Sequence, residues 1–217
     1  MKLEELMERV RANDPTLTHL SITGIQNTRA IPEEDTGDVV EIKDPYSALY
    51  YLYYRTGDGY IPDFSALAVN TTITHLKLTN CRLLDLLFLR GNTTITELEV
   101  CSNRIYNLNP LKTMTSLRSF VGCHNPFTSV EPLIHRPLTT LDISSTNVTD
   151  YHLISFIQTL TTLRLKSLAI SNTQFLSNLV LLEHLVLMFT INKTIEFMRD
   201  LHRITRLYLD HCGIKDL

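Results

Sequence analysis

Polar side chains are spread along this 217-residue chain, but their spacings match no catalytic motif. There is no glycine-rich phosphate loop, no H-E-x-x-H zinc motif and no C-x-x-C pair. Asp142, Ser144 and the histidines show no spacing that supports a hydrolytic triad. We therefore predict that the protein is not an enzyme and uses no cofactor.

Two histidines and a glutamate raise the question of a metal. His19, His75 and Glu97 would form one row if the strands that carry them are adjacent, about 4.8 Å apart. Zinc accepts such ligands. However, exposed histidine pairs are common, and a long insert follows His19, so we predict no metal site.

An eleven-residue phrase determines where these side chains lie. Ile73, Leu76, Leu78, Cys81 and Leu83 occupy its places 1, 4, 6, 9 and 11. The phrase recurs twice, and each ninth place follows the previous one by 22 residues. The recurring copies are Ile95, Leu98, Val100, Asn103 and Ile105, and Leu117, Phe120, Gly122, Asn125 and Phe127. This pattern is the L-x-x-L-x-L-x-x-N/C-x-L signature, by which the chain is identified as a leucine-rich-repeat protein.

The signature predicts an α/β solenoid over residues 1–217, with about eight coils. Places 4 and 6 put two apolar side chains on one side of a short strand. A buried asparagine at place 9 can bond the backbone at the turn. Stacked coils then share one core, with a curved parallel sheet on the concave face and helices or 3-10 turns on the convex face.

Later copies are less regular. The ninth place moves to Thr146, 21 residues on, and then to Thr173 after a step of 27 residues, which leaves room for a helix over 150–159. A step of 17 residues leads to Thr190, and Cys212 follows 22 residues later. The copy around Thr173 reads Leu165, Leu168, Ile170, Thr173 and Phe175, and an early copy reads Leu17, Leu20, Ile22 and Ile25.

Two segments differ from the regular repeats at 70–217. Residues 1–16 contain an apolar stripe from Leu3 to Ala12, which predicts a helix that caps the first coil. Residues 28–69 form an insert, with a polar loop at 33–38 and a helix over Tyr46–Arg55 that begins at Asp44-Pro45. A second short helix is expected over Pro62–Val69.

Composition and net charge argue against several kinds of partner and location. The net charge of −3 argues against a general nucleic-acid or membrane surface. No run of eighteen apolar residues occurs, and the acidic N-terminus does not resemble a secretory signal. We predict a cytoplasmic protein with no nucleic-acid or membrane partner.

The cysteines and the glycosylation triplets are also interpreted as those of a cytoplasmic protein. Cys101 and Cys123 would be neighbours, but parallel strands rarely meet disulfide geometry, so we expect reduced thiols. The triplets at Asn70, Asn92, Asn147 and Asn192 are interpreted as turn asparagines before β-branched residues.

Two further resemblances suggest functions. Leu3-Glu4-Glu5-Leu6 and the stretch from Val10 to Thr18 resemble the tropomodulin leucine-rich-repeat domain, which implies a cap on actin filaments. The stretch from Asn103 to Leu117 resembles repeats of bacterial internalins and of phosphatase-regulating proteins. This mixture also suits a leucine-rich-repeat effector of an intracellular bacterium, which would work in the host cytosol. All of these families use the repeat to bind proteins.

Side chains at places 3, 5 and 7 should line the concave face. In the coil around Thr173 these places hold Ser167, Ala169 and Ser171. Val186, Met188 and Tyr208 are candidate anchors, because such types are enriched in protein interfaces. Six tyrosines in the insert suit either recognition or packing. The predicted partner-binding residues are Lys77, Glu97, Glu99, Val121, Asp142, His184, Val186, Met188, Arg206, Tyr208 and Asp210, with Tyr50, Tyr51 and Tyr54 from the insert.

We predict a protein-binding module that regulates or inhibits its partner by covering it with the concave face. The alternatives are an actin-capping protein, the substrate-recognition part of an enzyme complex, and an extracellular recognition protein.

Overall fold

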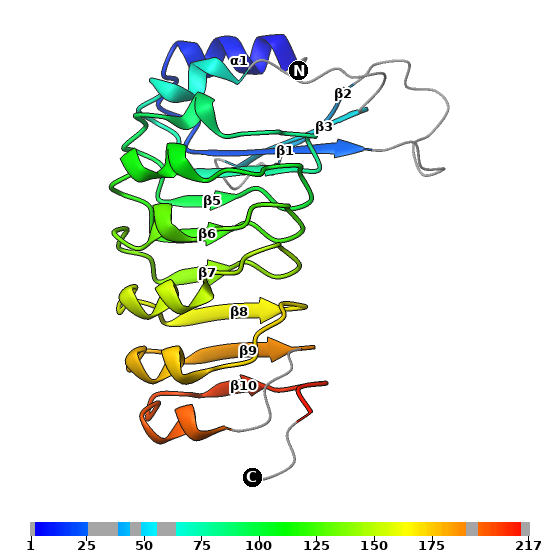
Figure 1. Cartoon of the computed structure of the whole chain (residues 1–217). Coiled ribbons are helices and arrows are strands. Elements are labelled where there is room, and N and C mark those ends of the chain that lie inside the picture. The colour runs from blue at the N-terminus through cyan, green and yellow to red at the C-terminus, as the bar shows by residue number, and fades with distance from the viewer. Residues whose placement is uncertain (1–2, 26–38, 44–48, 56–63, 190–194, 214–217) are drawn as a thin grey trace.

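The computed structural model describes residues 3–25, 39–43, 49–55, 64–189 and 195–213. Strands from successive repeats lie side by side in one sheet, and short 3-10 helices form the opposite side of the stack (Figure 1). The predicted leucine-rich-repeat solenoid is confirmed. Its eight repeat strands in the described residues are β1 (His19–Ile25), β4 (His75–Thr79), β5 (Glu97–Glu99), β6 (Ser119–Val121), β7 (Thr140–Asp142), β8 (Thr162–Lys166), β9 (His184–Met188) and β10 (Arg206–Tyr208).

The side opposite the strands consists of one short turn of 3-10 helix per coil. Each turn buries apolar residues against the continuous core, which the strands cover from the other side. The turns are η1 (Ser65–Ala68), η2 (Leu87–Leu89), η3 (Asn109–Thr113), η4 (Glu131–Leu133), η5 (Tyr151–Phe156), η6 (Gln174–Asn178) and η7 (Glu196–Arg199). The predicted helices over Pro62–Val69 and 150–159 are therefore shorter, 3-10 elements.

The core is filled mainly by the apolar places of the repeat. Leu76, Leu98 and Leu141, at place 4, are each at most 2% exposed. Gly122 stands where other coils carry Leu, Val or Ile, because the ring of Phe120 occupies that space. A Cβ at Gly122 would lie 2.6 Å from the Phe120 ring.

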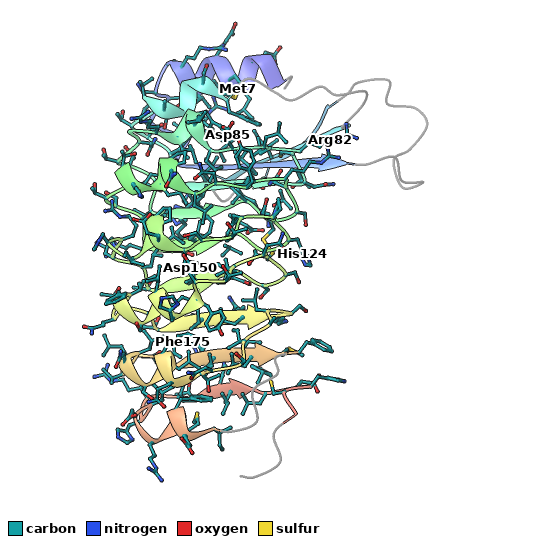
Figure 2. All side chains as sticks on the ribbon, viewed as in Figure 1. Met7, Arg82, Asp85, His124, Asp150 and Phe175 are labelled. Carbon is teal, nitrogen blue, oxygen red and sulfur yellow. A yellow bond between two sulfur atoms is a disulfide. The ribbon has the colours of Figure 1, made fainter. Side chains whose placement is uncertain are left out.

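In the coils of β4 to β10, a residue with a left-handed backbone conformation precedes the ninth place. From β4 to β10 the eighth place has φ between 54° and 57° and is never glycine in this chain. These residues are Asn80, Ser102, His124, Ser145, Ser167, Phe189 and His211. His124 lies on the side of the stack where the strands end, away from the 3-10 helices (Figure 2).

The predicted register around Thr173 was wrong. In β8, Leu163 pairs with Leu141 of β7 and with Leu185 of β9, and Leu165 pairs with Leu187 of β9. Leu163 and Leu165 therefore hold places 4 and 6, which makes Leu168 the ninth place. Leu168 follows Thr146 by 22 residues and precedes Thr190 by 22, which restores the regular step.

The predicted helix over Tyr46–Arg55 was also wrong. Residues Leu49–Arg55 form a strand, β3, that pairs with β1 in parallel, and β2 (Val39–Lys43) lies antiparallel on its outer side. Tyrosine-rich segments favour strands, and the free edge of β1 provides backbone partners. The predicted loop at 33–38 lies outside the described residues.

The N-terminal helix α1 (Leu3–Arg11) packs on the first coil, as its apolar stripe predicts. Met7 lies between the helix and the stack (Figure 2), and it is buried together with Leu6 and Val10. The turn after α1 is held by Asp14. Hydrogen bonds from the Thr16 hydroxyl and backbone, and then from Arg9, lower the pKa of Asp14 to about 2. Among the described residues, no helix is long and apolar enough to cross a membrane.

Candidate functional site: the concave sheet face

The concave face is the surface formed by places 3, 5 and 7 of the eight repeat strands. Residues at the same place in adjacent strands are direct register partners, so each place forms a row. On these strands, or within two residues of their ends, the structure places the predicted Lys77, Glu97, Glu99, Val121, Asp142, His184, Val186, Met188, Arg206, Tyr208 and Asp210.

The coil that follows β7 contributes different residues from those predicted. Thr162, Arg164 and Lys166 occupy places 3, 5 and 7 of β8. Ser167, Ala169 and Ser171 lie beyond the strand and do not join the rows. Sequence reasoning therefore missed two cations, which a step of 22 residues counted from Thr146 would have found.

In the N-terminal part of this face, charged side chains pair with one another. Lys77 Nζ lies 2.7 Å from Glu99 Oε1, and His75 Nε2 lies 3.1 Å from Glu97 Oε1. These side chains, with Ser119 and Val121, line a shallow depression of about 190 Å³.

His19 and His75 stack in the same region. Because β4 pairs directly with β1, the two rings lie 3.9 Å apart with an interplanar angle of 14°. Each Nδ1 lies within 2.9 Å of the preceding threonine hydroxyl. Burial, and then the charge of His75, lower the pKa of His19, while Glu97 raises it. Within the described residues, no three His, Cys, Asp or Glu side chains are grouped to hold a metal.

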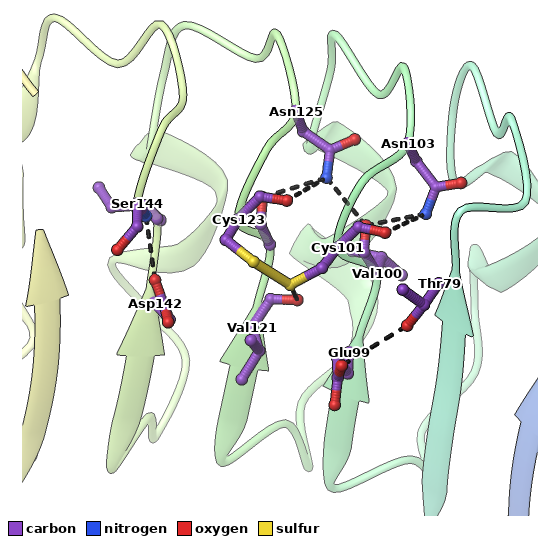
Figure 3. Close-up of a disulfide and its surroundings, with 12 residues drawn as sticks. Thr79, Glu99, Val100, Cys101, Asn103, Val121, Cys123, Asn125, Asp142 and Ser144 are labelled. Carbon is purple, nitrogen blue, oxygen red and sulfur yellow. Dashed lines mark hydrogen bonds between the residues drawn. A yellow bond between two sulfur atoms is a disulfide. The ribbon is translucent and has the colours of Figure 1, made fainter. Parts of the chain in front are cut away.

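Cys101 and Cys123 form a disulfide on this face, so the expectation of reduced thiols was wrong for this pair (Figure 3). They occupy place 7 of adjacent coils, with Cα atoms 4.7 Å apart. The left-handed turn that follows each cysteine, held by Asn103 or Asn125, brings the two side chains together at the strand ends. Cys81 and Cys212 are free and buried.

The two asparagines beside the disulfide cross-link three coils (Figure 3). Asn103 Nδ2 donates to the carbonyls of Leu78 and Val100, at 2.7 and 2.9 Å. Its Oδ1 accepts from the backbone N–H groups of Cys81 and Leu83, at 2.8 and 3.1 Å. Asn125 repeats this arrangement one coil later. The predicted role of the ninth place is confirmed for these coils.

The C-terminal part of the face combines apolar groups with cations. Val186 is buried at its centre, while Tyr208 is 56% exposed. Arg164 is the register partner of Val186, and Lys166 is the partner of Met188. The predicted anchors therefore lie together on this part of the face.

The tyrosine candidates of the insert lie on β3. Tyr50 and Tyr51 pair with Leu20 and Ser21, and Tyr54 pairs with Gly24, which extends the sheet beyond β1. Their side chains lie outside the described residues, so their role in binding stays a prediction.

In two of the glycosylation triplets, the asparagine side chain is buried and bonds to the backbone. Asn70 and Asn92 are each 2% exposed, and their Oδ1 atoms accept backbone N–H groups at the start of the next strand. The interpretation as turn asparagines is confirmed for this pair. Asn147 is exposed, and Asn192 lies outside the described residues.

The fold resembles known leucine-rich-repeat structures. No protein-family model and no curated protein sequence matches the chain. Among solved structures, it is similar to internalin InlF of Listeria monocytogenes, with a TM-score of 0.65 and 24% identity over 72% of this chain and 47% of that one. Internalin C2 of the same species gives a TM-score of 0.64 and 26% identity over 69% and 66%.

A complex of TLR13 with single-stranded RNA gives a TM-score of 0.51 and 20% identity over 68% of this chain and 23% of that one. The chain thus spans between about half and two thirds of the two internalin chains. The repeat signature, the parallel sheet and these structural neighbours together identify a leucine-rich-repeat solenoid of the internalin type in its fold.

Proposed function

We propose that this protein binds a partner protein on its concave face and regulates or inhibits that partner by covering its functional surface. A protein-interaction module in general is supported by the fold and by its leucine-rich-repeat neighbours. The observation that carries the finer proposal is the cluster of Val186, Met188 and Tyr208 on an open sheet face. An apolar centre with a polar rim is typical of protein interfaces.

The test begins with identifying the partner. Capture with the intact chain, compared with a chain that lacks residues 28–60, shows whether the insert contributes. Titration of the purified partner then compares the intact chain with the double variant Met188→Ala and Tyr208→Ala. We expect a loss of about 2 kcal/mol, or roughly 30-fold in Kd, because tyrosine is among the types that dominate interface energies and methionine is enriched at interfaces.

A matched control comes from the other side of the stack. Leu87 and Tyr106 are also large and exposed, at 60% and 61%, but Leu87 belongs to η2 and Tyr106 lines a depression beside η2 and η3. The variant Leu87→Ala with Tyr106→Ala should leave the affinity unchanged. Equal losses for both double variants, or no loss for Met188 and Tyr208, would reject the assignment.

An extracellular recognition protein is a second candidate, and the Cys101–Cys123 disulfide favours it, because disulfides persist in oxidising compartments. Counting free thiols in protein taken from its native source tests this point. A cytoplasmic location, including the host cytosol for a bacterial effector, would require these cysteines to be reduced there.

The actin-capping and substrate-recruiting alternatives rest on sequence likeness and on analogy. Pyrene-actin assembly with the purified chain tests the first, since a capping protein slows growth at one filament end. Co-purification of a catalytic subunit tests the second.

A further inference from the structure

The last three strands form a compact grid on the concave face, which we call the basic-rimmed patch. Its centre is apolar and consists of Val186, Met188 and Tyr208. Its rim carries Arg164, Lys166 and Arg206. Because adjacent strands lie about 4.8 Å apart, all of these Cα positions fall within roughly 10 Å of Val186.

The rim cations have no partner of opposite charge in the part of the chain that the structure describes. Throughout the described residues, no carboxylate oxygen lies within 4.0 Å of Arg164, Lys166 or Arg206, whereas Lys77 has such a partner on the same face. An exposed cation without a counter-charge is available to a ligand at a small desolvation cost.

Two carboxylates of the same face, Asp142 and Asp210, have contacts outside the patch. Asp142, the register partner of Arg164, accepts the backbone N–H of Ser144 at 3.0 Å. Asp210 lies 2.8 Å from the Nδ1 atom of His211. The ring of His211 in turn stacks on Phe189, with centroids 4.6 Å apart. The three cations Arg164, Lys166 and Arg206 outnumber these two carboxylates, so a surplus of positive charge surrounds the apolar centre.

Building on the proposed function, we infer that the basic-rimmed patch binds an acidic segment of the partner protein. One apolar or aromatic side chain of that segment packs on Val186 and Met188 beside Tyr208. Aspartates or glutamates on both sides of it pair with Arg164 and Lys166 at one edge and with Arg206 at the other. Arginine suits such contacts, because its guanidinium binds carboxylates in a bidentate manner.

The same cations could meet the phosphates of single-stranded nucleic acid, but the centre favours a protein. Nucleic-acid sites pair cations with several stacking aromatic rings. Here two of the three central side chains, Val186 and Met188, are aliphatic or thioether groups. The chain as a whole also carries a net charge of −3.

A random peptide library displayed on phage provides the test. Selection on the full chain should enrich peptides in which Asp or Glu flank an aliphatic or aromatic residue. Synthetic copies of the enriched peptides should bind at least about tenfold more weakly to Arg164→Glu with Lys166→Glu, because the attraction becomes repulsion. Selection on that variant should enrich Lys and Arg instead.

The matched control is Arg90→Glu with Arg104→Glu, which makes the same change of net charge at two exposed arginines outside the three rows. This control should retain peptide affinity. Circular dichroism of both variants verifies that they fold.

The outcomes separate this inference from the proposed function. Enriched peptides without acidic residues, which depend on Met188 and Tyr208 but not on Arg164 and Lys166, would overturn the acidic partner and keep the binding face. Enriched peptides that are insensitive to all four residues, or no enrichment at all, would overturn both. Tight binding of poly(U) that is lost in the charge-reversed variant would assign the patch to nucleic acid and end the inference.

Discussion

The middle coils contain β4 to β6, and the last coils contain β8 to β10. These two groups of coils use their polar side chains in opposite ways. In the middle coils, asparagines, a disulfide and ion pairs link side chains or backbone groups of neighbouring coils. In the last coils, Leu168 holds the ninth place after β8 and Cys212 the ninth place after β10, and three cations of the concave face have no charged partner among the described residues. We call the cross-linked middle coils the frame, and we distinguish them from the last coils, whose surface cations are available to a ligand.

This division has a physical reason. A buried hydrogen bond is costly to break, because the abandoned groups remain desolvated. Exposed charges on a sheet contribute little to folding and keep their interaction energy for a ligand. Substitutions in the middle coils should therefore affect stability, and substitutions in the last coils should affect binding.

The largest effect is expected for Asn103→Ala. It leaves the N–H groups of Cys81 and Leu83 and the carbonyl of Leu78 without their partner. We expect the free energy of unfolding to fall by about 4 kcal/mol in urea denaturation. The exposed Asn147 serves as control, and Asn147→Ala should change stability by less than about 0.5 kcal/mol. Similar values for the two variants would remove the distinction between frame and surface.

Loss of the disulfide comes next. Cys101 and Cys123 are 22 residues apart, and the bond restricts the unfolded chain over that loop. The variant Cys101→Ser with Cys123→Ser should lower the free energy of unfolding by about 3 kcal/mol. Adding a reductant to the unchanged protein should give the same loss and should have no effect on the variant. A variant that is as stable as the oxidised protein would show that the pair does not support the frame.

The last coils should show a much smaller effect on stability. Tyr208 is largely exposed, and Met188 is partly so, so the double variant to alanine should unfold within about 1 kcal/mol of the unchanged protein. The same variant should lose partner affinity, which is the reverse of the result for Asn103→Ala. A loss of stability as large as that of Asn103→Ala would mean that these residues belong to the frame.

The smallest effect concerns acid stability at the stacked histidines. Burial and the charge of His75 lower the pKa of His19, so the folded protein binds a proton there less readily than the unfolded chain does. Stability from this site is complete at neutral pH and decreases as the pH falls below the ordinary histidine value of 6.5. His19→Gln should make the decline shallower between neutral and mildly acidic pH, as followed by thermal unfolding.

A steeper decline in His19→Gln would contradict the sign that we assign to this site.

The repeat and its turns could be predicted because they depend on local spacing. Asn103 and Asn125 were assigned to the turn from a 22-residue step alone, and both lie there. The register of β8 could not be assigned in the same way. Its segment contains two overlapping copies of the leucine pattern, Leu160, Leu163 and Leu165, and Leu165, Leu168 and Ile170, so apolar spacing alone did not distinguish them.

The candidate site was predicted in part. Met188 and Tyr208 were placed on the concave face correctly, whereas Arg164 and Lys166 were missed because of the register error. The strand β3 was missed because Leu49 and Leu52 have helical spacing, while the pairing that decides its structure involves β1, about 30 residues earlier.

By itself, the sequence determined the solenoid, its core places and its turns, because each coil repeats the same short-range pattern of apolar and amide groups. The tertiary structure alone decided which strands became neighbours. The insert pairs on the outer side of β1, so His19 meets His75 across 56 residues of chain, and the turns bring Cys101 to Cys123. Such contacts depend on the lateral order of strands in the sheet, which local periodicity does not encode.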